Sequence, residues 1–201
     1  MISKSKLGIL ISFLFLTGPA LVVGGGKLPN DVRWVRQSAE HRTLCEQLFR
    51  QATVAILRQV KMEKGSKNLA VVVDLDETVL DNSLYQVERW KAGLSFTQDS
   101  WSDWVNREEA GLIPGAKAFL STVRKKGVLV VFLSNRMNDN LEPTRGNLQA
   151  LGVLDPMDLF LLRLDKHDLK EVRRKEVTDG TGRMKKVGPL HVIGYVGDQM
   201  G

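Results

Sequence analysis

The chain has 201 residues, of which 43% are hydrophobic and 26% are charged, a balance typical of a folded domain rather than a disordered or fibrous chain. The single cysteine, Cys45, excludes an internal disulfide and any zinc site built on paired cysteines. The 29 basic and 23 acidic residues give a net charge of +6, which favours an acidic partner. Because the basic residues are scattered rather than gathered on one long helix, we expect no binding to a nucleic acid polymer.

The first segment has the pattern of an export signal. Lys4 and Lys6 precede an apolar run over 7–16, and a helix breaker and the small Ala20 follow it. This pattern predicts a signal peptide over residues 1–20, or as far as residue 26, and therefore an exported protein of the periplasm, the cell envelope or the extracellular space. An uncleaved signal anchor is the alternative, and it would be the only route by which the protein associates with a membrane.

From residue 27 onward the sequence predicts alternating helices and strands. Apolar residues fall at helical spacing over 31–64, where Asn30 and Asp31 can cap the start of a helix and Gly65 can end it. We expect strands over 69–73, 128–133, 159–162 and 191–196, with further helices over 116–126 and 141–151. This alternation indicates β-α-β units, so the predicted fold class is α/β: a three-layer, Rossmann-like open parallel sheet in one domain over 27–201.

A segment of different composition interrupts this alternation between about 81 and 113. It holds five of the 13 aromatic residues of the chain: Tyr85, Trp90, Phe96, Trp101 and Trp104. We interpret it as a small helical cap that is inserted into the domain after the first strand.

Polar side chains follow three of the predicted strands at the point where each strand ends. Asp74 and Asp76 follow the first strand, Ser134 follows the second and Asp198 follows the last. Acids after strands often cap turns, but three such positions in one sheet favour a binding site, because ligands of open α/β sheets bind at the carboxyl ends of the strands. Carboxylates gathered there repel one another unless they share a cation, and an all-oxygen ligand set selects Mg²⁺ before Zn²⁺.

These strand ends also carry a family resemblance. Residues 72–85, Val-Val-Asp-Leu-Asp-Glu-Thr-Val-Leu-Asp-Asn-Ser-Leu-Tyr, resemble the first motif of the class C (four-aspartate) acid phosphatases and 5′-nucleotidases of the haloacid dehalogenase superfamily. Residues 132–136 are similar to the second motif of that family, residues 195–198 to the start of the fourth, and residues 34–40 to the start of the helix before the fold. The first motif is highly specific, because fourteen consecutive positions fit.

The resemblance implies a Mg²⁺-dependent phosphomonoesterase that forms an aspartyl-phosphate intermediate. Asp74 is then the nucleophile, and Asp76 protonates the leaving group and later activates water. Ser134 and Asn135 bind the phosphoryl group. The side chains of Asp74 and Asp198 hold Mg²⁺ together with the backbone carbonyl of Asp76.

Two lysines compete for the third motif of the family, which also binds phosphate. Lys170 begins the segment 170–174, which resembles the family's lysine followed by an arginine pair, and we prefer it. Lys166 is the alternative, because the spacing from Asp165 to Lys170 is one residue longer than the family pattern and Val172 stands where proline is frequent.

The resemblance further implies a nucleoside monophosphate as substrate, with its base held by aromatic rings of the cap. The candidate substrate-binding residues are Asn82, Tyr85, Trp90 and Phe96. Aromatic residues at helical spacing more often form a core, so the same rings are also candidates for the interior of the cap.

The end of the sequence departs from the family pattern. The fourth motif of the family continues beyond Asp198 to a further metal-binding aspartate, and the sequence stops at Gly201, one residue before that position. We therefore expect a C-terminally truncated or degenerate member with weakened Mg²⁺ binding. Two other classes of function stay open: a non-catalytic nucleotide-binding protein, and a membrane-anchored protein that uses the fold as a scaffold.

Overall fold

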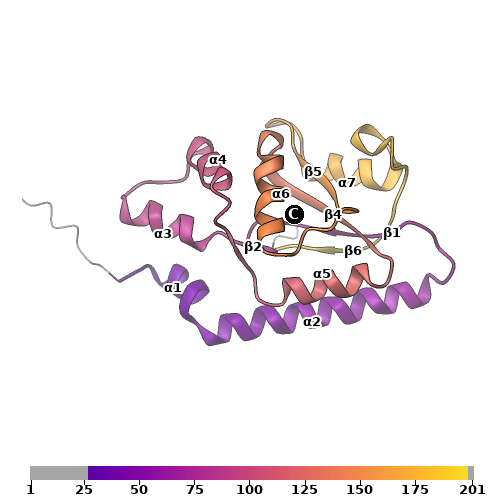
Figure 1. The fold of residues 1–201 in the computed structure, drawn as a ribbon, viewed down its shortest axis with the longest axis horizontal. Coiled ribbons are helices and arrows are strands. Elements are labelled where there is room, and N and C mark those ends of the chain that lie inside the picture. The colour runs from indigo at the N-terminus through magenta and orange to yellow at the C-terminus, as the bar shows by residue number, and fades with distance from the viewer. Residues whose placement is uncertain (1–26, 199–201) are drawn as a thin grey trace, which may run out of the picture.

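The central sheet of the protein has four parallel strands. The computed structural model describes residues 27–198, so the predicted signal peptide lies outside the described residues. The strand order is β5-β4-β1-β6, with β1 at Leu69–Val73, β4 at Leu129–Met137, β5 at Leu159–Arg163 and β6 at His191–Val196. Helices cover both faces of this sheet (Figure 1). The predicted α/β class, with an open parallel sheet between helical layers, is confirmed.

Seven α-helices and two short 3₁₀ turns lie within the described part of the chain. The helices are α1 (Asn30–Gln37), α2 (Ala39–Met62), α3 (Ser83–Lys91), α4 (Gln98–Asn106), α5 (Ala116–Arg124), α6 (Leu141–Ala150) and α7 (Lys170–Asp179). The 3₁₀ turns are η1 (Asn138–Asn140) and η2 (Gly182–Met184). Within residues 27–198, none of the helices combines the length and the apolar character that crossing a bilayer requires.

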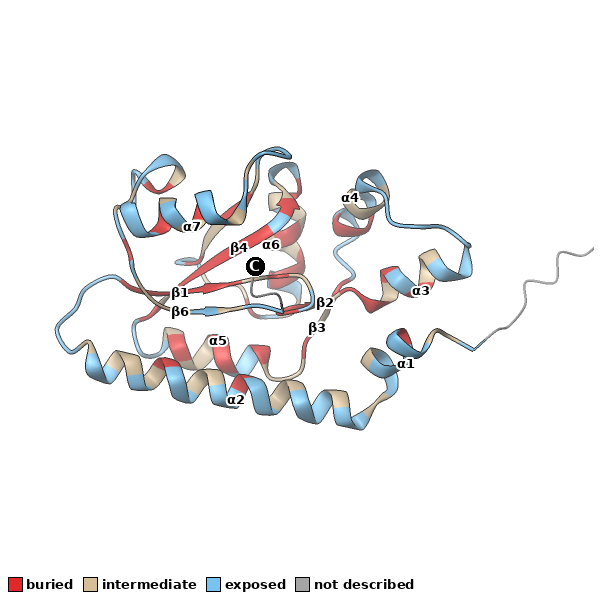
Figure 2. Cartoon of the chain, turned by 180° about the vertical axis from the view of Figure 1, so that it is seen from behind, coloured by how far each residue is buried: buried red, intermediate tan, exposed pale blue. Residues whose placement is uncertain are grey.

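Strand β1 is buried along its whole length because helices pack on both of its faces. Val71 and Val73 belong to the apolar core beneath α2, α5 and α6, whereas Ala70 and Val72 belong to a second core beneath α7. Figure 2 shows buried residues along β1 and β4 and on the inward sides of α5 and α6. The continuous apolar run of β1 is the pattern expected of a strand covered on both faces.

The later strands are added on both sides of β1. The chain runs from β1 to β4 and β5 on one side, and then returns through α7 to β6 on the other side of β1. In register, Val73 lies beside Val196, so β1 and β6 end together. Ligands of open α/β sheets bind where the strand order reverses in this way, at the carboxyl ends of the strands.

The helix predicted over 31–64 is in fact two helices. Ser38 has an extended backbone, and its hydroxyl accepts a hydrogen bond from the His41 N–H at 3.0 Å, so Ser38 is the N-cap of α2. A serine in this role starts a new helix because its side chain satisfies a free backbone N–H. The prediction that Asn30 and Asp31 cap the first helix is also wrong, since Pro29 occupies the N-cap and no side chain caps it.

The second predicted strand is longer than its apolar run. Strand β4 continues beyond Leu133 to Met137, because β5 pairs with it as far as Ser134 and again, after an irregularity, at Met137. Ser134 therefore lies inside the strand rather than after it.

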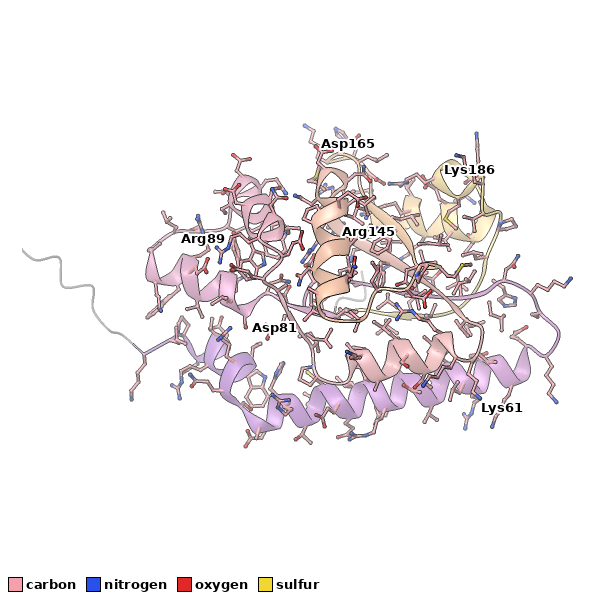
Figure 3. The ribbon with its side chains drawn as sticks, viewed as in Figure 1. Lys61, Asp81, Arg89, Arg145, Asp165 and Lys186 are labelled. Atoms are coloured by element: carbon pink, nitrogen blue, oxygen red, sulfur yellow. The ribbon has the colours of Figure 1, made fainter. Side chains whose placement is uncertain are left out.

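The inserted segment contains α3 and α4, and two short strands of two residues each connect it to the rest of the domain. Strand β2 (Leu80–Asp81) pairs antiparallel with β3 (Gly111–Leu112) at this junction. Figure 3 shows Asp81 where the insertion meets the body. We call the segment between β2 and β3 the cap.

Candidate active site

Asp74 is the first residue after β1, and two contacts fix its carboxylate. Its Oδ1 accepts a hydrogen bond from the Leu75 N–H at 2.8 Å, and its Oδ2 contacts the Lys170 ammonium. The Asp74 N–H donates to the Val196 carbonyl at 2.9 Å, which joins this residue to the end of β6. Burial raises the pKa of Asp74, and the hydrogen bond and charge of Lys170 oppose that rise.

Lys170 reaches Asp74 because it is the first residue of α7, and the start of this helix lies over the carboxyl end of β1. Lys166 lies in the exposed turn before the helix. Of the two lysines that the sequence left open, the structure therefore places Lys170 beside Asp74.

The Asp76 carboxylate accepts hydrogen bonds from three side chains. Its Oδ1 accepts hydrogen bonds from Asn82 Nδ2 at 3.0 Å and from Arg136 Nε and Nη2 at 2.9 and 2.8 Å. Its Oδ2 accepts from the Ser134 hydroxyl at 3.2 Å. Arg136 is only 1% exposed, and its fixed planar fork suits a carboxylate. Arg136 is the last residue of the second motif, and the family resemblance implied no role for it.

Ser134 and Asn135 come together with a second buried arginine. The Ser134 hydroxyl accepts from the Arg136 N–H at 3.0 Å, and the Ser134 carbonyl accepts from Arg173 Nη1. Asn135 is exposed, and its Oδ1 accepts from Arg173 Nη2 at 2.7 Å. Arg173 is fully buried on α7 and also pairs with Asp168 at 3.4 Å. It therefore fixes the end of β4 to the helix that carries Lys170.

Asp198 follows β6 at the same edge of the sheet as Asp74. Its N–H donates to the Thr78 hydroxyl at 3.0 Å. The neighbouring Glu77 reaches the surface, yet its pKa is raised to about 7, first because its carboxylate is partly desolvated and then because Asp76 and Asp198 repel its charge.

The fit of this edge to a metal ion depends on its donor atoms. Two carboxylates, Asp74 and Asp198, and the backbone carbonyl of Asp76 form an all-oxygen set, which suits a hard divalent cation. Over residues 27–198, no three side chains of the histidine, cysteine, aspartate and glutamate types gather as a metal site. A cation here therefore depends on the carbonyl or on water as well as on the two carboxylates.

A cavity of about 190 Å³ opens beside Asp74 and Lys170. Val72 of β1, Leu133 of β4 and Tyr195 of β6 are among its other lining residues, so it lies between the sheet and the start of α7. One charged acceptor, Asp74, and two charged donors, Lys170 and Arg174, line its wall and suit a small anionic group.

The four candidate substrate-binding residues divide into two pairs. Asn82 is fully buried and Tyr85 is 2% exposed, with its hydroxyl 2.9 Å from Ser100 Oγ. Both side chains therefore lie in the interior, and Tyr85 presents no surface on which a base can stack. Trp90 and Phe96 are 38% and 60% exposed, and Phe96 packs edge-on against Tyr85.

Comparison with known proteins gives the family. The model of the haloacid dehalogenase superfamily, subfamily IIIB (acid phosphatase), matches residues 26–201. The chain belongs to this family. Phosphatases of this superfamily generally use a divalent metal ion.

Solved structures agree with this assignment. The class C acid phosphatase from Bacillus anthracis with tungstate bound is similar with a TM-score of 0.70 and 29% identity, over 84% of this chain and 67% of that one. Another structure of the class C acid phosphatase from Bacillus anthracis gives a TM-score of 0.64 and 33% identity, over 73% of this chain and 61% of that one.

A curated relative is the stem 31 kDa glycoprotein of Glycine max, which is 28% identical over 81 residues. The match takes in 40% of this chain and 32% of the soybean protein. The similarity therefore extends over about a third of that relative.

Proposed function

We propose that this protein is a phosphomonoesterase that hydrolyses phosphate esters through an aspartyl-phosphate. One observation carries the proposal: the Asp74 carboxylate, paired with Lys170, lies at the wall of a small cavity where β1 and β6 end. Asp76, two residues along, contacts the Ser134 hydroxyl, so the side chains to which we assign the nucleophile, the acid and the phosphate-binding groups lie at one sheet edge.

In the first half-reaction a carboxylate oxygen of Asp74 attacks the phosphorus atom and forms an acyl-phosphate bond. The ester P–O bond breaks, its electron pair leaves with the ester oxygen, and that oxygen takes a proton from the Asp76 carboxyl group. Lys170 and the Ser134 hydroxyl bind phosphoryl oxygens, where negative charge is concentrated.

In the second half-reaction the Asp76 carboxylate takes a proton from a water molecule. The water oxygen attacks the phosphorus atom, the bond to Asp74 breaks, and inorganic phosphate leaves with the carboxylate regenerated. The proton lost by Asp76 in the first step is thus restored in the second.

A divalent cation, for which we propose Mg²⁺, fits the oxygen atoms of Asp74, Asp198 and the Asp76 carbonyl. When bound, it would offset the repulsion between these carboxylates and the incoming phosphate and polarise the phosphoryl group. Lys170 supplies a positive charge at the nucleophile in any case.

For the substrate we propose a 5′-nucleotide, whose base stacks on the cap. Trp90 and Phe96 support this proposal because their rings are exposed on the cap, and stacking tolerates any base. We further propose that the protein is exported, on the pattern of its first 20 residues, and sequencing the N-terminus of the mature protein tests that proposal.

The test of the proposed activity is release of inorganic phosphate by the purified full chain from AMP and from 4-nitrophenyl phosphate. We expect release that stops with EDTA, returns with added Mg²⁺ and is absent in Asp74→Asn. Asp31→Asn, which neutralises an exposed carboxylate of α1, is the matched control and should keep full activity. Nucleotide binding without phosphate release would instead identify a non-catalytic binding protein.

A further inference from the structure

A buried chain of hydrogen bonds runs from the cap to Asp76. The indole N–H of Trp104, on α4, donates to Asn82 Oδ1 at 2.9 Å, and Asn82 Nδ2 donates to Asp76 Oδ1 at 3.0 Å. Trp104 is 2% exposed and Asn82 is fully buried, so water does not compete for these bonds. The cap therefore touches the proposed acid through one amide group.

The indole determines which way that amide faces. An indole nitrogen can only donate a hydrogen bond, so the Asn82 oxygen must point to Trp104 and the Asn82 NH₂ group must point to Asp76. Arg136 Nη2 also donates to the same Asn82 oxygen, at 3.4 Å. Without the Trp104 N–H, only the longer bond from Arg136 and the Asp76 oxygen itself would favour this orientation of the amide.

The two oxygens of Asp76 are then unequal. Oδ1 accepts from Asn82 and twice from Arg136, whereas Oδ2 has the Ser134 hydroxyl at 3.2 Å and Arg136 Nε at 3.3 Å. A proton on Oδ1 would face three N–H groups that already point at it. A proton on Oδ2 faces only one N–H group, the more distant Arg136 Nε, and a hydroxyl that can rotate and then donate to a phosphoryl oxygen instead.

From this geometry we infer that Trp104 and Asn82 are positioning residues that fix Oδ2 of Asp76 as the oxygen that exchanges the proton with the leaving group. The inference rests on the proposed function and adds to it the way in which the cap acts on the chemistry. Neither residue touches the substrate in this scheme. When the ester P–O bond breaks, the proton moves from Oδ2 to the departing oxygen, and Oδ1 stays bound to Asn82 and Arg136.

The test depends on the leaving group. Glycerol 2-phosphate releases a poor alkoxide that needs the proton, whereas 4-nitrophenyl phosphate releases a stabilised phenolate that hardly does. We compare kcat/KM for the two esters, because this ratio reports the steps up to formation of the aspartyl-phosphate and leaves its hydrolysis out. A loss of cap structure alone lowers both values together.

The variants are Trp104→Phe, which removes the indole N–H and keeps a ring, and Asn82→Asp, which replaces the donor toward Asp76 with an oxygen. The control is Val105→Ala, which thins the packing of the next residue on α4, itself 2% exposed, without touching the chain of hydrogen bonds. If Trp104→Phe does not fold, Asn82→Asp carries the test.

We expect both variants to lower kcat/KM for glycerol 2-phosphate by about tenfold, the value of one buried hydrogen bond, and for 4-nitrophenyl phosphate by less than about threefold. Val105→Ala should change both esters by the same factor. Equal losses on the two esters in both variants, or no loss on either, would overturn the positioning role. A wild-type protein that releases phosphate from neither ester nor from AMP would refute the proposed function itself, and the positioning role with it.

Discussion

Replacing Lys170 with methionine removes a positive charge that contacts the proposed nucleophile. The ammonium of Lys170 pairs with Asp74 Oδ2, and the two side chains are 19% and 13% exposed, so the pair is largely shielded from water. Methionine keeps most of the length of the lysine stem. The variant therefore tests the charge and leaves the packing of α7 nearly unchanged.

The expected loss follows from the electrostatics of a partly buried pair. Two unit charges about 4 Å apart interact by about 4 kcal/mol at an effective dielectric constant of about 20. Since about 1.4 kcal/mol corresponds to a factor of ten, this sets an upper limit near 10³ on the effect. Removing one donor to a developing oxyanion costs about 10²–10³ in rate. We therefore expect kcat/KM for phosphate release to fall by about 10²–10³ in Lys170→Met.

A second measurement follows from the pKa of Asp74. Burial raises this pKa, and Lys170 lowers it through a hydrogen bond and through its charge. Without Lys170 the pKa rises further, so a larger fraction of the nucleophile is protonated at acidic pH. The acid limb of the kcat/KM profile should therefore move to higher pH in the variant, as a profile of both proteins will show.

Lys166→Met is the control, because Lys166 is exposed and lies before α7 rather than on it. It should change neither the rate nor the acid limb. Full activity in Lys170→Met together with a large loss in Lys166→Met would refute the assignment of the third motif and the electrostatic reasoning with it.

Three further substitutions test the nucleophile and the packing. Asp74→Asn should reduce phosphate release to background while the melting temperature stays close to wild type; normal turnover would exclude Asp74 as the nucleophile. Gly180→Ala should lower the free energy of unfolding by at least about 2 kcal/mol, because φ is +66° and a Cβ would lie 2.4 Å from the backbone nitrogen of Pro189. Gly127→Ala is the control: its φ is also positive, but a Cβ would have no atom within 4 Å, so the loss of stability should be smaller. Arg124→Met leaves Asp158 buried and unpaired, so urea unfolding should show a loss of about 3–5 kcal/mol at neutral pH. Burial raises the pKa of Asp158, and without Arg124 it rises further; the deficit should therefore shrink as falling pH protonates the carboxyl, and a deficit independent of pH would contradict this account.

The parts of the fold that the sequence predicted well are those where burial follows from apolar residues alone. The run Leu69–Val73 is bounded by polar residues and buried throughout, and it forms β1 with the predicted limits. His191–Val196 also forms β6 with the predicted limits, although its residues are only half-buried or exposed. Because these two strands end side by side, Asp74 and Asp198 share a sheet edge, as the strand-end pattern indicated. Hydrophobic patterning and sheet topology together are sufficient for that result.

Other features depend on partners that a local pattern does not contain. The end of β4 is set by pairing with β5 as far as Met137, so the apolar run stops four residues before the strand does. The helix breaks at Ser38 because the Ser38 side chain accepts a hydrogen bond from the His41 N–H and so caps a new helix instead of continuing the first one. Tyr85 appeared to be a stacking surface because its type allows both roles, and only the packing of the cap places it in the interior.

The site itself depends on two buried arginines whose environment no spacing rule predicts. A buried guanidinium must be paired, so the position of each one fixes the groups around it. Arg136 binds Asp76 and the Thr144 hydroxyl, and Arg173 binds the Ser134 carbonyl and Asn135. Hydrophobic patterning assigns arginines to the surface, so it places both of these wrongly. An arginine two residues after the serine of this motif is therefore better interpreted as an internal partner of the Asp76 carboxylate. The geometry of Arg136 supplies this rule, and apolar periodicity cannot.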